Sequence, residues 1–133
     1  MRRFVIGPDV ALELAERRAS IPAEHRLLAP TLLRSQVLAQ LYGAARIGTL
    51  TWRDADRRLE YLRKLNIRLL GDRALQQEAW KFAERFGWAD TFVAEYVALT
   101  KLQADALVVG DRELRGELSK AIPVATIADV LVA

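Results

Sequence analysis

The stretch from Trp88 to Leu114 constrains the fold of this 133-residue chain more than any other. Apolar residues recur at helical spacing on more than one face of its first half, which predicts a helix that is packed on most sides. The short apolar run Ala106–Val109 then predicts a buried strand, after which the chain turns at Gly110 and Asp111. Open α/β folds place their chemistry at the carboxyl ends of parallel strands. We therefore expect Asp111 to lie beside a functional site.

Shorter patterns along the chain predict an alternation of strands and helices. Runs rich in Val, Leu and Ile predict strands at residues 3–6, 27–29, 66–70, 106–109 and 122–124, of which 66–70 fits either a strand or an extended connector. Helical periodicity and capping residues predict further helices at 9–18, 32–45, 51–64, 74–86, 112–120 and from 126 onward. This order implies an α/β fold of one domain, residues 1–133, with a small parallel sheet covered by helices on both faces.

The helix expected at 32–45 carries an apolar stripe and a polar flank. The stripe predicts the side chains that face the core, and the flank holds two amides four residues apart, Gln36 and Gln40. The stripe consists of Leu33, Val37, Leu38 and Leu41.

Composition and charge exclude several classes of function. The chain has no cysteine, so it has no disulfide, thiolate zinc site or cysteine nucleophile. Its apolar runs are too short to cross a membrane, and Pro8 and Asp9 stand where a signal peptide needs apolar residues, so we expect a cytoplasmic protein. The net charge of +3 is compatible with a nucleic acid or an acidic protein as partner. The basic segment 53–68 also contains acids four residues before basic residues, as solvated helix faces do.

Three acids follow predicted strands or begin predicted helices: Asp9, Asp90 and Asp111. The sequence has none of the glycine-rich nucleotide-binding motifs, serine-hydrolase motifs or zinc-protease motifs. Carboxylates that converge at one edge of a parallel sheet could hold Mg²⁺ or Mn²⁺. The metal could then activate a bound water molecule to attack a phosphodiester. For Asp9 and Asp90 an equally good interpretation is a helix N-cap. The single histidine, His25, has no partner at ligand spacing apart from Glu24, and we expect it in a surface loop.

Three segments carry a resemblance to a known family. The chain is similar over nearly its whole length to PIN domains, and within them it most resembles the VapC-like toxins of bacterial toxin-antitoxin pairs. The segments are APTLLRSQVLAQLY at 29–42, FVAEYVALTKLQADALVVGDREL at 92–114 and IPVATIADVL at 122–131. The resemblance implies a parallel sheet between helices, RNA as substrate, Mg²⁺ or Mn²⁺ as cofactor, an antitoxin protein as partner and a homodimer.

The family's four acids match this sequence unevenly. The first matches Gly7 in an ungapped alignment, with Asp9 in a following small polar position, whereas a shift of two residues makes Asp9 the acid. The second matches Gln36, and the third matches Val93, with Asp90 one helical turn earlier. Asp111 matches the fourth directly. The sequence therefore predicts Asp9, Asp90 and Asp111 as metal ligands, with Gln36 as an auxiliary polar group.

Two functions follow from these matches. The leading prediction is a VapC-like ribonuclease, the toxin of a type II toxin-antitoxin pair, in which a metal-bound water attacks RNA. The alternative is a degenerate PIN module that does not cut and that works by binding RNA, an antitoxin or a second copy of itself. The alternative is motivated by the absence of acids at Gln36 and Val93.

Overall fold

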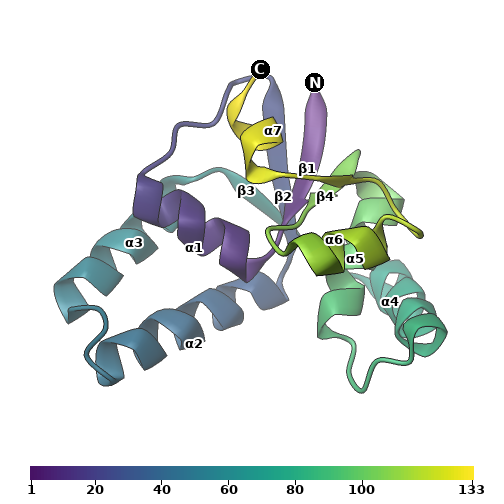
Figure 1. The fold of residues 1–133 in the computed structure, drawn as a ribbon, viewed down its shortest axis with the longest axis horizontal. Helices are drawn as coiled ribbons and strands as arrows, with labels where there is room; N and C mark the ends of the chain where they lie inside the picture. Colours follow the sequence, from purple (N-terminus) through teal and green to yellow (C-terminus); the bar gives the residue numbers. More distant parts are fainter.

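A five-stranded, fully parallel sheet forms the centre of the molecule (Figure 1). The computed structural model describes residues 1–133. The spatial order of the strands is β3-β2-β1-β4-β5. Their bounds are β1 Arg2–Ile6, β2 His25–Pro30, β3 Ile67–Leu70, β4 Ala106–Val108 and β5 Val124–Ala125.

Seven helices connect and cover the strands in two layers. Helix α5 packs against β1, β2 and β4, with α4 against α5, while α1 packs against α2 and α3. Right-handed crossovers place α1 and α5 on opposite faces, because β1 leads to β2 in one direction across the sheet and β3 leads back to β4 in the other. The helices are α1 Pro8–Arg17, α2 Leu32–Arg46, α3 Trp52–Lys64, α4 Arg73–Phe86, α5 Phe92–Gln103, α6 Arg112–Leu118 and α7 Ile127–Leu131.

This topology creates a switch point between β1 and β4. The chain leaves β1 toward β2 and leaves β4 toward β5, so the two neighbouring strands send their connections in opposite directions. Such a divergence leaves a crevice outside the carboxyl ends of the two strands, which is where open α/β sheets bind ligands.

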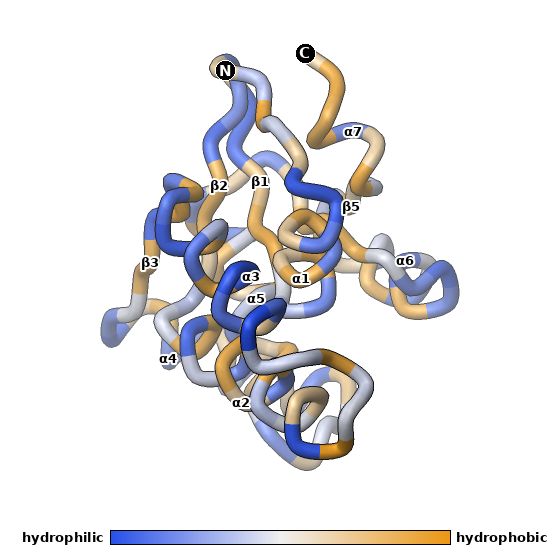
Figure 2. Tube along the Cα trace, turned by 90° about the vertical axis from the view of Figure 1, so that its left-hand side faces the viewer, coloured by the Kyte–Doolittle hydropathy of each residue, from blue (hydrophilic) through white to orange (hydrophobic).

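The hydrophobic core lies between the sheet and its covering helices. Phe4, Val5 and Ile6 of β1 are fully buried, and α5 buries nearly every residue from Ala94 to Thr100. Figure 2 shows the apolar part of β1 in the middle of the molecule. The prediction of a central helix packed on most sides is thus confirmed, except at its first turn, where Phe92 and Val93 are exposed.

The structure confirms the α/β class and corrects several local predictions. Asp9 does not cap α1: Gly7 is the N-cap residue, Pro8 follows it, and Asp9 lies inside the first turn. The last strand is Val124–Ala125 instead of 122–124, because its pairing with Leu107 and Val108 of β4 fixes its position. No helix combines the length and the apolar character that crossing a bilayer would require.

The prediction that His25 lies in a surface loop was wrong. His25 begins β2 and is buried. Its Nδ1 lies 2.7 Å from the carbonyl oxygen of Val130 in α7, and its ring packs edge-on against Phe4 with the centroids 5.0 Å apart. The histidine therefore joins the C-terminal helix to the sheet.

Candidate functional site

A cavity of about 250 Å³ lies at the switch point, outside the carboxyl ends of β1 and β4. Its polar groups come from three elements that are far apart in the sequence. The residues that carry these polar groups are Asp9, Gln36, Gln40 and Tyr96, and the cavity is also lined by Gly7 and Val93, which stand where the resemblance expects acids. The topology thus brings together four of the positions that the sequence singled out: Gly7, Asp9, Gln36 and Val93.

The carboxylate of Asp9 lies between two glycines. A Cβ atom built on Gly7 would be 3.1 Å from Asp9 Oδ1, and one built on Gly110 would be 3.3 Å from Asp9 Oδ2. Both distances are at the short end of van der Waals contact, so the absence of side chains at Gly7 and Gly110 leaves the room that the carboxylate occupies. Asp9 therefore fills the space beside residue 7, where the resemblance expects the first acid.

Gln36 is held by the phenol of Tyr96. The Tyr96 hydroxyl donates a hydrogen bond of 2.5 Å to Gln36 Oε1, which joins α2 to α5 across the cavity. Gln40 lies one helical turn after Gln36 on α2, and Val93 lies one turn before Tyr96 on α5, so each pair shares a helix face.

The ionisation of the site follows from burial. Burial raises the pKa of the Tyr96 phenol, and the nearby charges of Glu95 and Asp9 raise it further. Tyr96 is therefore protonated at any physiological pH and acts as a hydrogen-bond donor. Burial also raises the pKa of the neighbouring Glu95 carboxyl.

The other two expected ligands, Asp90 and Asp111, are not among the residues that line the cavity. Asp90 lies in the connection before α5, and its Oδ1 accepts the backbone N–H of Phe92 at 3.0 Å. Asp111 is the N-cap of α6, and its Oδ1 accepts the backbone N–H of Glu113 at 3.1 Å. Each of these carboxylates thus serves the start of its own helix.

The residues at the cavity do not fit a divalent-metal site. No group of three or more His, Cys, Asp or Glu side chains in the structure is placed to hold a metal ion. Mg²⁺ and Mn²⁺ are bound through oxygen ligands whose negative charge offsets the charge of the ion. Asp9 is the one carboxylate among the lining residues, and the Gln36 oxygen already accepts the Tyr96 hydroxyl.

Two contributors to the cavity, Tyr96 and Gln40, were not assigned to the site from the sequence. Helical spacing held a signal for both, because Tyr96 follows Val93 by three residues and Gln40 follows Gln36 by four. The Tyr96–Gln36 bond itself joins residues 60 positions apart, and local patterns carry no information on it.

Comparison with known proteins gives matches by structure only. No protein-family model and no curated protein sequence matches the chain. The fold is similar to the crystal structure of PAE2754 from Pyrobaculum aerophilum, with a TM-score of 0.76 and 23% identity over 98% of this chain and 93% of that one. It is also similar to VapBC-1 from nontypeable Haemophilus influenzae, with a TM-score of 0.59 and 14% identity over 95% of this chain and 98% of that one. Together with the parallel sheet and its two helical layers, these likenesses show that the fold is a PIN-like three-layer α/β sandwich.

Proposed function

We propose that this chain is a PIN-like module that acts by binding a partner protein, without metal-dependent cleavage of RNA. One observation carries the proposal: the cavity at the switch point contains a single carboxylate, that of Asp9. In place of the acids expected at positions 36 and 93, the chain has an amide that accepts a hydrogen bond from Tyr96 and an apolar side chain.

The chemistry of phosphodiester hydrolysis favours this proposal over the leading sequence prediction. A metal-bound water needs an ion that is held in place and that offsets the charge of the scissile phosphate. One carboxylate competes poorly with the hydration shell of Mg²⁺, which loses water reluctantly. Asp90 and Asp111 lie outside the lining of the cavity, and each uses one carboxylate oxygen to accept a backbone N–H, from Phe92 and Glu113 respectively.

A protein partner is supported by the likeness to VapBC-1, whose name belongs to the toxin-antitoxin pairs that the sequence resembles. On this proposal the partner is antitoxin-like, and the PIN-like sheet serves as a rigid support for the binding surface. The module keeps the fold and the switch-point cavity, and Asp9, Gln36 and Gln40 give the cavity polar groups that can accept or donate hydrogen bonds.

A metal-titrated cleavage assay on structured RNA tests the first half of the proposal. Wild type is compared with Asp9→Ala and Asp111→Ala over a range of Mg²⁺ and Mn²⁺ concentrations. We expect the same residual cleavage in all three proteins, because contaminating nucleases do not depend on these side chains. Cleavage by wild type that both substitutions reduce about a hundredfold or more, the lower end of the effect of a catalytic acid or base, would contradict the proposal and support the nuclease.

A binding comparison tests the second half. The purified chain is titrated with a labelled single-stranded RNA at low and at physiological salt. We expect the affinity to collapse at physiological salt, as non-specific phosphate contacts do. Tight binding of one RNA at physiological salt would favour an RNA-binding module instead of a protein-binding one.

A further inference from the structure

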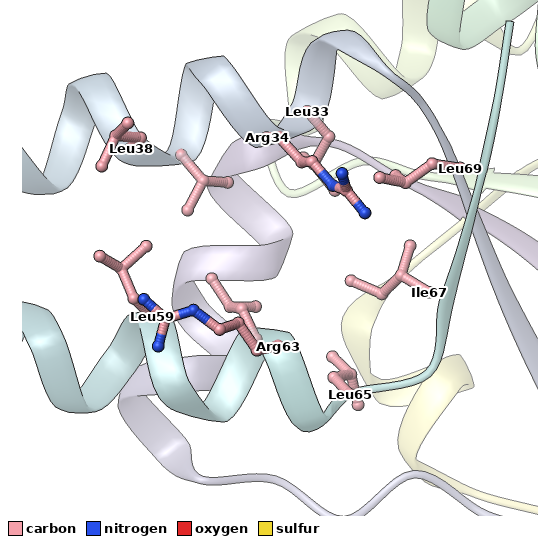
Figure 3. A pocket seen from close by; sticks show the side chains of 10 residues that line it. Leu33, Arg34, Leu38, Leu59, Arg63, Leu65, Ile67 and Leu69 are labelled. Atoms are coloured by element: carbon pink, nitrogen blue, oxygen red, sulfur yellow. The ribbon is translucent and has the colours of Figure 1, made fainter.

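A second and larger cavity lies away from the switch point, between α2, α3 and β3. Its volume is about 540 Å³, and eight of its ten lining residues are hydrophobic. Figure 3 shows side chains from all three elements around it: Leu33 from α2, Leu59 from α3, and Ile67 and Leu69 from β3. Since β3 is the outermost strand on its side of the sheet, the cavity forms a groove at the sheet's edge.

The charge on this groove is positive. The two lining residues that are not hydrophobic are both arginines, Arg34 on α2 and Arg63 on α3, and no acid lines the cavity. They lie on opposite walls in Figure 3. Arg63 is paired with Glu60 at 2.6 Å, whereas none of the ion pairs in the structure includes Arg34. The groove therefore offers one unpaired guanidinium beside an apolar floor.

The apolar surface continues from the groove along α2. The sequence pattern placed Leu38 on the core-facing stripe of this helix, but 56% of Leu38 is exposed, and it lines the groove. Tyr42, one turn further along the helix, is 63% exposed. Leu33, Val37 and Leu41 of the same stripe are buried as expected. A leucine and a tyrosine one turn apart extend the groove into a longer surface on which apolar side chains can pack.

From these observations we infer that the groove between α2, α3 and β3 binds an amphipathic segment of a partner protein that carries carboxylates beside its apolar side chains. This inference rests on the proposed function, because it names the surface and the chemistry of the partner. The apolar side chains of the segment fill the leucine-rich floor and cover Leu38, while a carboxylate pairs with Arg34.

Charge argues against the two other occupants that a PIN-like module could have. A second copy that docked through the same face would place its Arg34 and Arg63 opposite the same two arginines, with no acid among the lining residues to separate them. An RNA strand would satisfy the arginines, but its phosphates and sugars would leave the eight hydrophobic residues without apolar partners.

The test selects ligands without assuming the partner's identity. A display library of random 16-residue peptides is panned against the whole chain, and enriched peptides are synthesised and titrated by fluorescence anisotropy. We expect enriched sequences to combine apolar residues at helical spacing with Asp or Glu. Their affinity for Arg34→Glu and for Leu38→Asp should fall about tenfold or more, because one variant reverses the pairing charge and the other places a charge on the apolar surface.

Two controls separate docking from general charge and from misfolding. Arg112→Glu makes the same charge change on α6, where Arg112 is exposed and lies outside the groove, and it should leave peptide affinity unchanged. Arg34 and Leu38 are also exposed, so thermal melts of their variants should match wild type. A peptide in which Lys replaces the acid should regain affinity for Arg34→Glu while losing it for wild type.

Several results would overturn the inference. They are an absence of enriched peptides, enriched peptides without acids, and affinities that Arg34→Glu and Leu38→Asp leave unchanged. Concentration-dependent dimerisation that Leu38→Asp abolishes would assign the groove to a second copy. Binding of single-stranded RNA that is lost in Arg34→Glu would assign it to RNA. Failure of the inference leaves the proposed function testable, because the cleavage assay concerns Asp9 and Asp111 and not the groove.

Discussion

Carboxylates introduced at positions 36 and 93 should give the switch-point cavity an affinity for divalent metal. The double variant Gln36→Glu, Val93→Asp adds two carboxylates to a cavity that already contains Asp9. A glutamate at 36 can still accept the hydroxyl of Tyr96, and 40% of Val93 is exposed, so neither change has to disrupt the core. The variant should acquire the divalent-metal affinity that we do not expect of wild type.

The expected size of the effect follows from linkage. A ligand that binds only the folded state at 100 times its dissociation constant stabilises that state by about 2.7 kcal/mol. Unfolding entropy of about 2.1 cal/mol/K per residue gives about 0.28 kcal/mol/K for 133 residues, so this gain raises the Tm by about 10 °C. For wild type, with one carboxylate, the shift should be about 1 °C or less at the same Mn²⁺ concentration, since weak binding adds little to stability.

The assay is a thermal melt of both proteins with and without 10 mM Mn²⁺, a concentration about 100 times a dissociation constant on the order of 0.1 mM. A matched control, Leu102→Asp with Gln103→Glu, adds the same two charges at the far end of α5. Leu102 is 43% exposed, similar to Val93, and neither residue of the control lines the cavity. An Mn²⁺-dependent shift in wild type as large as that of the double variant, or an equal shift in the control, would refute the explanation that missing carboxylates keep wild type from binding metal.

Three further predictions concern the groups around the site and the C-terminal cap. Tyr96→Phe removes the hydroxyl that donates a hydrogen bond to the Gln36 oxygen and should lower the free energy of unfolding by about 1 kcal/mol in a urea titration. Burial raises the pKa of Glu95 in the folded state, so the charged carboxylate destabilises the fold at pH values above this folded-state pKa. Below the pKa of the unfolded chain, near 4.3, the carboxyl is protonated in both states and the cost disappears. Glu95→Gln should therefore raise the Tm at pH 7 and leave it unchanged at pH 3.5. The hydrogen bonds from Thr126 lower the pKa of Asp129 in the folded state, so the Asp129 carboxylate stabilises the fold. This stabilisation is fully present above the pKa of the unfolded chain, near 3.9, and is lost as the pH falls through the folded-state pKa. Asp129→Ala should therefore lower the Tm at pH 7 by about 2 °C, the equivalent of about 0.5 kcal/mol for an exposed charged contact, and the difference should shrink near pH 3.

The sequence predicted most of the fold because the deciding signals were local. Thr51, Asp72 and Thr126 lie at or just before the starts of helices that the sequence predicted, and each caps its helix through a side-chain hydrogen bond. Gly87 ends α4 in the left-handed region, with φ of 69°, which glycine adopts without steric cost. Caps and terminators act over a few residues, so a linear pattern contains all the information that they need.

The errors arose where burial depends on distant parts of the chain. His25 is buried because Val130, 105 residues away, provides an acceptor for its ring. Leu38 is exposed although it fits the apolar period of α2, because the groove beside α3 has no part of this chain to fill it. Periodicity identifies apolar side chains that could be buried, and only tertiary packing decides whether another segment covers them.

The candidate site was predicted in part, for the same physical reason. Asp9 and Gln36 line the same cavity because the strand order fixes where α1 begins after β1 and where α2 begins after β2. Asp90 and Asp111 had the right positions in the sequence, but each carboxylate accepts a backbone N–H at the start of a helix. An acid that follows a strand and begins a helix looks the same in sequence whether it caps the helix or turns toward a ligand.

The fold does not need acids at positions 36 and 93, because acids at this cavity would contribute little to folding. Carboxylates that share a cavity repel one another when no metal is bound, so their replacement removes a cost from the folded state. Here an amide at 36 accepts a hydrogen bond from Tyr96, which joins two helices without adding charge, and Asp9 occupies the space that Gly7 leaves open. The groove between α2, α3 and β3 depends on none of these residues. The sheet, its helical layers and the groove therefore do not require acids at positions 36 and 93.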